Sequence, residues 1–113
     1  MRAIRMNGVP APDTQPRAPL GYSVGRWEGN TLVVTTSRIA WPYFDDTGIP
    51  LGARPTIVER FAPTSDGTRL NLTMTITDQD TFTQPVELAR SWVWRSGETV
   101  RPYNCVERKA AAR

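Results

Sequence analysis

Residues 22 to 39 constrain the fold of this chain more than any other segment. They read as two β-strands on either side of a Gly-Asn pair at positions 29 and 30. A two-residue loop of this kind suits the right-handed twist of paired strands, so the segment predicts a β-hairpin. Pairing across the loop places Trp27 opposite Leu32, and both then share one face with Val34. We expect that face to be the core.

Strand patterns continue through the rest of the chain. Leu70, Leu72, Met74 and Ile76 alternate strictly with polar residues, which indicates a half-buried strand. Further strands are expected at residues 2 to 6, 56 to 61, 86 to 95 and 99 to 106. About seven strands joined mostly by hairpins predict an all-β fold, a small antiparallel meander that forms an open barrel or a sandwich.

The net charge of +3 comes largely from the end of the chain. Residues 107 to 113 hold three basic residues and one acidic residue, so the rest of the chain has a net charge of +1. We interpret them as a basic C-terminal tail and residues 1 to 106 as a single β domain. Without the tail there is no clustered basic stripe, so we expect no nucleic-acid partner. No apolar run approaches the roughly 20 residues of a membrane span, and no signal peptide is evident, so we expect a soluble chain.

The sequence contains no histidine and one cysteine, Cys105. The absence of histidine excludes a Ser-His-Asp triad, an imidazole base and a typical zinc site. Cys105 has no partner for an internal disulfide, so cysteine usage does not indicate a compartment. The remaining chemistry is carboxylate acid or base catalysis, proton donation by tyrosine, charge stabilisation by arginine, or a hard cation held by oxygen ligands.

The stretch from residue 40 to 55 fits neither helix nor strand periodicity, and a loop this long in a small domain is typical of a functional segment. It gathers three aromatic residues, Trp41, Tyr43 and Phe44. Asp45 and Asp46 follow them directly, and adjacent carboxylates beside an apolar wall would have one proton affinity raised, which suits a general base for water, with Tyr43 or an arginine steadying the oxyanion. The same two aspartates could also supply part of a calcium site, which needs about six to eight oxygen ligands. The alternative is that residues 45 to 48 form a simple turn.

Trp92 and Trp94 are two residues apart and therefore lie on one face of a strand. In a filled core they are packing residues, whereas in an open barrel they and Trp27 line a ligand cavity beneath the loop aromatics. The first functional hypothesis is therefore a binder of an apolar or amphipathic small molecule that requires no cofactor. The second is a hydrolase of neutral esters or lactones that uses the paired aspartates, with or without calcium. The third is a structural subunit, such as a homodimer formed through an exposed edge strand.

The run from residue 20 to 36 resembles a group of bacterial proteins, many of them exported, that share a Gly-Arg-Trp-Glu-Gly-Asp/Asn-Thr-Leu-Val-Val motif. The resemblance continues through residues 57 to 61, 75 to 78 and 103 to 105. It implies a lipocalin-like β-barrel and no particular activity. Members often carry histidine at the position of Tyr22, so no imidazole chemistry is implied for this chain. They also have additional strands before the equivalent of Arg2, so the chain corresponds to a late part of a longer pattern.

Overall fold

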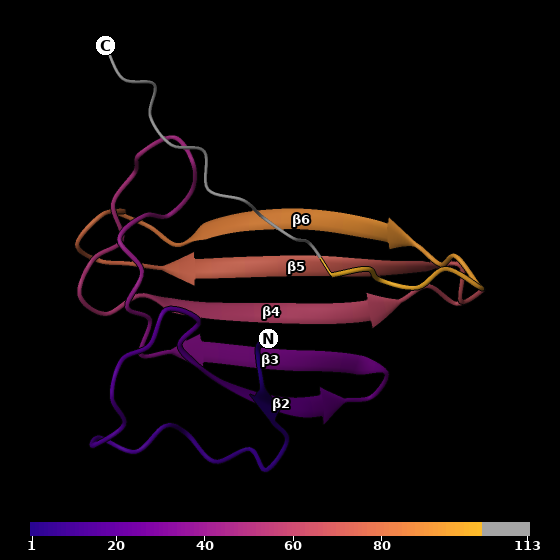
Figure 1. Cartoon of the computed structure of the whole chain (residues 1–113), viewed down its shortest axis with the longest axis horizontal. Coiled ribbons are helices and arrows are strands. Elements are labelled where there is room, and N and C mark those ends of the chain that lie inside the picture. The colour runs from indigo at the N-terminus through magenta and orange to yellow at the C-terminus, as the bar shows by residue number, and fades with distance from the viewer. Residues whose placement is uncertain (103–113) are drawn as a thin grey trace.

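The computed structural model describes residues 1 to 102, which form one open β-sheet (Figure 1). Its six strands are β1 (Ile4–Arg5), β2 (Tyr22–Glu28), β3 (Thr31–Ser37), β4 (Thr56–Pro63), β5 (Arg69–Thr77) and β6 (Val86–Val93). They lie side by side in chain order. The prediction of an all-β fold is confirmed. Within the described residues, no helix has the length and apolar character needed to cross a bilayer.

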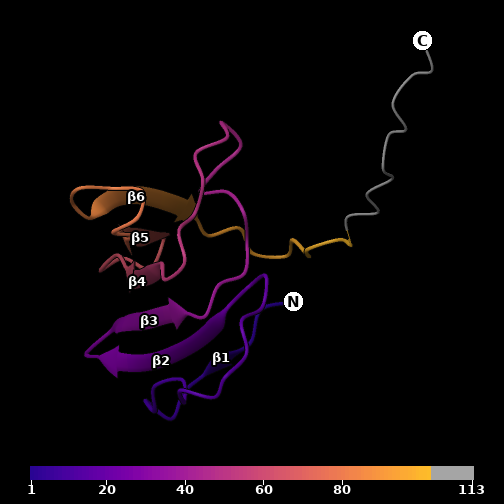
Figure 2. The same ribbon diagram turned by 90° about the vertical axis from the view of Figure 1, so that its left-hand side faces the viewer.

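Two features of the predicted topology differ from the structure. The sheet is mixed, because β1 pairs in parallel with β2, with Ile4 opposite Ser23. Residues 6 to 21 form the long crossover that a parallel pair needs, and Figure 2 shows this connection next to β1 at the edge of the sheet. The strand predicted at residues 99 to 106 is not a strand over 99 to 102. Its remainder, together with Cys105 and the predicted tail, lies outside the described residues.

The β2–β3 hairpin forms in the predicted register. Trp27 pairs with Leu32 and Gly25 with Val34. Gly29 has a φ of 59°, the positive value that a type II′ turn requires at its first central position and that glycine adopts without strain. The remaining neighbours, β3 with β4, β4 with β5, and β5 with β6, are also antiparallel.

Alternation along the strands gives the sheet two different faces. The first, here called the apolar face, includes Leu32, Val34, Ile57, Phe61, Leu72, Met74, Ile76 and Leu88. Its buried residues include Val34, Leu72 and Ile76. Trp27 shares this face as predicted, but its predicted burial is wrong, because it is 64% exposed. Trp27 lies close to the hairpin turn at the end of β2, and within residues 1 to 102 no second layer of structure packs over it.

The other face of the sheet, here called the polar face, carries more polar residues, although it also includes Val33, which is fully buried. It carries Arg26 on β2, Arg60 on β4 and the threonines of β5, which alternate with the apolar set. Two long connections, residues 38 to 55 and 78 to 85, lie at the same end of the strands (Figure 1). The candidate site is therefore sought at that end.

Candidate functional site

The loop of residues 40 to 55 has an internal hairpin-like structure. Tyr43 and Pro50 form an isolated antiparallel bridge. The Phe44 N–H donates to the Ile49 carbonyl at 2.7 Å, and the Leu51 N–H donates to the Pro42 carbonyl at 3.0 Å. These bonds order a segment that has no helix or strand period in its sequence.

The β5–β6 connection holds this loop in place. Asp78, which is 2% exposed, accepts the Gly52 N–H through Oδ2 at 2.7 Å, and Asp80 accepts the Ala53 N–H at 2.8 Å. A Cβ atom at Gly52 would overlap the side chains of both aspartates, so this position requires glycine. Phe82 also packs edge-on against Phe44, with ring centroids 5.1 Å apart. The loop is thereby anchored to the sheet at both polar and aromatic contacts.

The anchored loop and the apolar face together enclose a groove of about 340 Å³, here called the aromatic groove. Trp41, Tyr43 and Phe44 line it from the loop. Its other walls include Leu20, Ile39, Leu51, Ile57 and Met74. The structure therefore brings the three predicted loop aromatics to one site beside the sheet.

An ion pair between a buried carboxylate and a partly exposed arginine forms the polar part of the aromatic groove. Glu59 lies on the apolar face of β4 and is 5% exposed. Arg2 Nη1 donates to Glu59 Oε1 at 2.6 Å. Sequence reasoning missed this pair. The available signal was the alternation of Ile57, Glu59 and Phe61, which predicts that the carboxylate faces the core with its apolar neighbours.

Asp45 and Asp46 lie outside the aromatic groove. Both are exposed, and neither is among the residues that line it. Asp45 Oδ1 accepts bonds from the backbone N–H of Thr47, at 2.9 Å, and from its hydroxyl, and Gly48 follows with a φ of 92°. This arrangement is a turn capped by an aspartate. Hydrolysis by these carboxylates would require a substrate at the exposed turn, with Tyr43 on the groove side.

Residues 1 to 102 contain no group of three or more His, Cys, Asp or Glu side chains placed to hold a metal ion. Asp45 and Asp46 would have to recruit most of the oxygen ligands of a calcium ion from elsewhere. The calcium site remains a prediction from the sequence.

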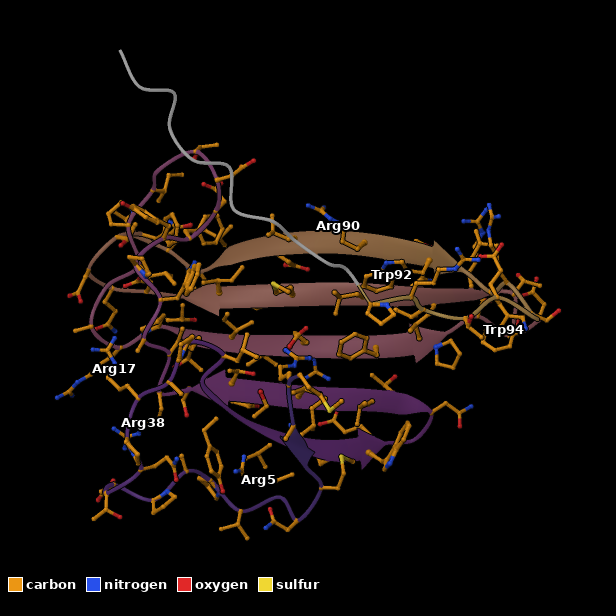
Figure 3. The ribbon with its side chains drawn as sticks, viewed as in Figure 1. Arg5, Arg17, Arg38, Arg90, Trp92 and Trp94 are labelled. Carbon is orange, nitrogen blue, oxygen red and sulfur yellow. The ribbon has the colours of Figure 1, made fainter. Side chains whose placement is uncertain are left out.

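The other predicted tryptophans lie at the opposite end of the sheet from the loop. Trp27 lines a second groove on the apolar face, of about 440 Å³, with Leu32, Phe61 and Leu70 among its walls. Trp92 of β6 pairs with Leu70 of the neighbouring strand β5 and is 48% exposed. Trp94 is 72% exposed, and Figure 3 shows it near Trp92 at this end. The structure does not gather Trp27, Trp92 and Trp94 around one cavity with the loop aromatics.

The charges that flank Trp27 form a network on the polar face. Arg60 donates to Glu28 at 2.8 Å, and Arg26 donates to it at 3.0 Å. The bonds from Arg60 and, next, from Arg26 hold the pKa of Glu28 below its ordinary value. Because all three side chains are exposed, the network contributes little to stability.

Comparison with known proteins found no protein-family model, curated protein or solved structure that is significantly similar to the chain. The resemblance to the exported bacterial group therefore stays a prediction. Function has to be inferred from the site itself.

Proposed function

We propose that the chain binds a small, neutral, amphipathic molecule in the aromatic groove. The observation that carries this proposal is the 2.6 Å pair of Arg2 and Glu59 within walls that are otherwise mostly apolar. A few fixed polar groups in an apolar wall are typical of small-molecule sites. The groove volume of about 340 Å³ lies at the small end of the range for such sites, which is about 300 to 1,000 Å³.

The ion pair favours a ligand without net charge. Arg2 and Glu59 neutralise each other, so a charged head group would bring an uncompensated charge into a mostly apolar site. A hydroxyl or carbonyl head can instead hydrogen-bond to the pair and keep the site neutral. The guanidinium has five N–H donors, and the hydrogen bond to Glu59 uses one nitrogen, Nη1. A neutral hydrogen-bonding head group is therefore the best match.

The loop aromatics favour an apolar ligand body. Trp41 is 56% exposed and Tyr43 is 52% exposed, so both retain surface that a ligand can cover. Each Å² of apolar surface removed from water contributes about 25 cal/mol to binding before the costs of association. The hydrogen bonds to Asp78 and Asp80 hold the loop in position beforehand, which reduces the ordering cost.

Tryptophan emission tests the proposal directly. A variant with Trp27, Trp92 and Trp94 changed to Phe leaves Trp41 as the reporter. This variant is titrated with 1-octanol, 2-phenylethanol and geraniol, and with octanoate as the charged counterpart of octanol. We expect a saturable change in emission with at least one alcohol and about tenfold weaker binding of octanoate.

Glu59→Gln provides the matched control because it keeps the shape of the side chain and removes its charge. The groove then holds the unpaired guanidinium of Arg2, so octanoate should bind more tightly than octanol. Emission that does not change with any of these compounds at millimolar concentration would contradict the proposal. An unchanged preference between octanol and octanoate in Glu59→Gln would also contradict it.

A further inference from the structure

Three arginines from separate segments line one concave site at the loop end of the sheet, here called the arginine pocket. Arg17 precedes β2, Arg38 directly follows β3, and Arg54 lies just before β4. Ser37 and Thr56 complete the polar lining of a volume of about 300 Å³. The remaining wall residues are prolines and alanines, so the lining contains no carboxylate.

The arginine pocket and the aromatic groove lie on opposite faces of the same two strands. Thr36 of β3 and Ile57 of β4 line the groove, whereas their chain neighbours Ser37 and Thr56 line the pocket. Successive residues of a strand point to opposite faces. The two sites share no lining residue, so the pocket does not depend on the function proposed for the groove.

Backbone pairing fixes Arg17 beside Arg38. Ala18 and Ile39 form an isolated bridge, in which the Ala18 N–H donates to the Arg38 carbonyl at 3.0 Å. The guanidinium of Arg17 donates through Nε and Nη2 to the Ile39 carbonyl, at 3.2 and 2.7 Å. These bonds use one edge of the guanidinium and leave Nη1 as a further donor group. Figure 3 shows both arginines at the same end of the sheet.

Little in the pocket neutralises these charges. Arg38 lies 3.8 Å from Asp13, whose side chain is fully exposed, so water screens this pair. Arg54 has no salt bridge within residues 1 to 102. Asp78 and Asp80 line an adjoining groove that shares Arg54, and their carboxylates, which hold the anchored loop, offset part of the Arg54 charge from outside the pocket. Like charges held near one another by the backbone favour a bound anion.

We propose that the arginine pocket binds the phosphate group of a small molecule. Three arginines from different segments that line one pocket suit an anion with a charge near −2 and several acceptor oxygens better than a planar monocarboxylate. Ser37 and Thr56 can supply hydroxyl donors to the same group. A volume of about 300 Å³ leaves room for an organic substituent, so a phosphate monoester is the expected ligand class.

Titration followed by ¹H–¹⁵N NMR tests this site at constant ionic strength set with chloride. The probes are inorganic phosphate, glycerol 3-phosphate as a monoester, and acetate as a monocarboxylate. We expect saturable shifts in the Nε–Hε signals of Arg17, Arg38 and Arg54 with both phosphates, and weaker binding of acetate. Arg54→Gln and Arg38→Asn should each weaken phosphate binding about tenfold, the usual loss for a charge-assisted bond. Arg38 has a φ of 57°, a conformation that asparagine tolerates, so Arg38→Asn removes the charge without forcing the backbone to change.

Arg69→Gln is the matched control, because it removes one exposed arginine from the polar face outside the pocket. It should change phosphate binding less than twofold, and Trp41→Ser in the aromatic groove should have no effect. The absence of saturable arginine shifts would overturn the proposal, as would acetate binding equal to that of phosphate. An equal loss of affinity in Arg69→Gln and Arg54→Gln would also overturn it, because general attraction to a basic chain would then explain the binding.

Discussion

Removing Arg2 should destabilise the protein much more than removing its partner, Glu59. The Glu59 side chain is 6% exposed and sits on a central strand, so without Arg2 it becomes an unpaired carboxylate in an apolar site. Breaking a fully buried pair in this way costs about 3 to 5 kcal/mol. Because the Arg2 side chain is 33% exposed, water can partly replace it. We therefore expect Arg2→Met to lower the free energy of unfolding by about 2 kcal/mol.

The reverse change has a smaller expected effect. In Glu59→Leu, Arg2 can turn toward solvent because its side chain is already 33% exposed. The leucine meanwhile joins apolar neighbours on β4, so stability should change by less than about 1 kcal/mol. The double variant should recover most of the loss seen in Arg2→Met, because replacing both partners of a buried pair by apolar residues is often neutral or stabilising.

Urea unfolding at pH 7, followed by far-UV circular dichroism, measures all four proteins in a double-mutant cycle. A loss of about 2 kcal/mol corresponds to a fall in the melting temperature of roughly 10 °C for a domain of this size. Equal losses in the two single variants would refute the reasoning. A change below about 0.5 kcal/mol in Arg2→Met would refute it as well, because the pair would then behave as an exposed one.

Three further changes test the turn, the loop anchor and the core. Hydrogen bonds, first from the Thr68 N–H, hold the pKa of Asp66 at about 2, below its ordinary 3.8. Their stabilisation should be present above about pH 4 and lost as the pH falls toward 2, and Asp66→Asn should remove this component from unfolding curves recorded across that range. Asp78→Ala should cost about 1 to 3 kcal/mol in urea unfolding and accelerate hydrogen exchange of the Gly52 amide, because a buried acceptor is lost. Leu72→Ala should cost about 2 to 5 kcal/mol, more than serine substitutions of the exposed loop aromatics, and an equal cost would contradict the assigned core.

The sequence predicts the β2–β3 register because two local signals agree there. The Gly-Asn loop sets the turn length, and the alternation around Trp27 sets the face, so no distant contact is needed. The burial of a side chain, in contrast, depends on what other parts of the chain pack over it. The alternation assigns Trp27 to the apolar face but does not reveal what covers it, and it is 64% exposed.

The parallel pairing of β1 could not be predicted in the same way. It depends on how the proline-rich residues 6 to 21 return the chain to the edge of β2, and no local pattern encodes that path. The arginine pocket likewise depends on a contact between segments that are distant in the sequence. Arg17 and Arg38 are far apart in the sequence, where the basic residues show no cluster, and the Ala18–Ile39 bridge brings them together.

The junction between β3 and β4 explains why both candidate sites lie at one end of the sheet. Thr36 and Ile57 face the aromatic groove, whereas the adjacent Ser37 and Thr56 face the arginine pocket. The loop that joins these strands supplies aromatic residues to the groove and Arg54 to the pocket. Gly52, which is anchored to Asp78, lies between the aromatic residues and Arg54 in the sequence.

Weakening that anchor should therefore affect both sites at once. Asp78→Ala should weaken alcohol binding in the groove and phosphate binding in the pocket, whereas Glu59→Gln should alter only the groove and Arg38→Asn only the pocket. If Asp78→Ala accelerated amide exchange at Gly52 but left both affinities unchanged, the loop would not position either site.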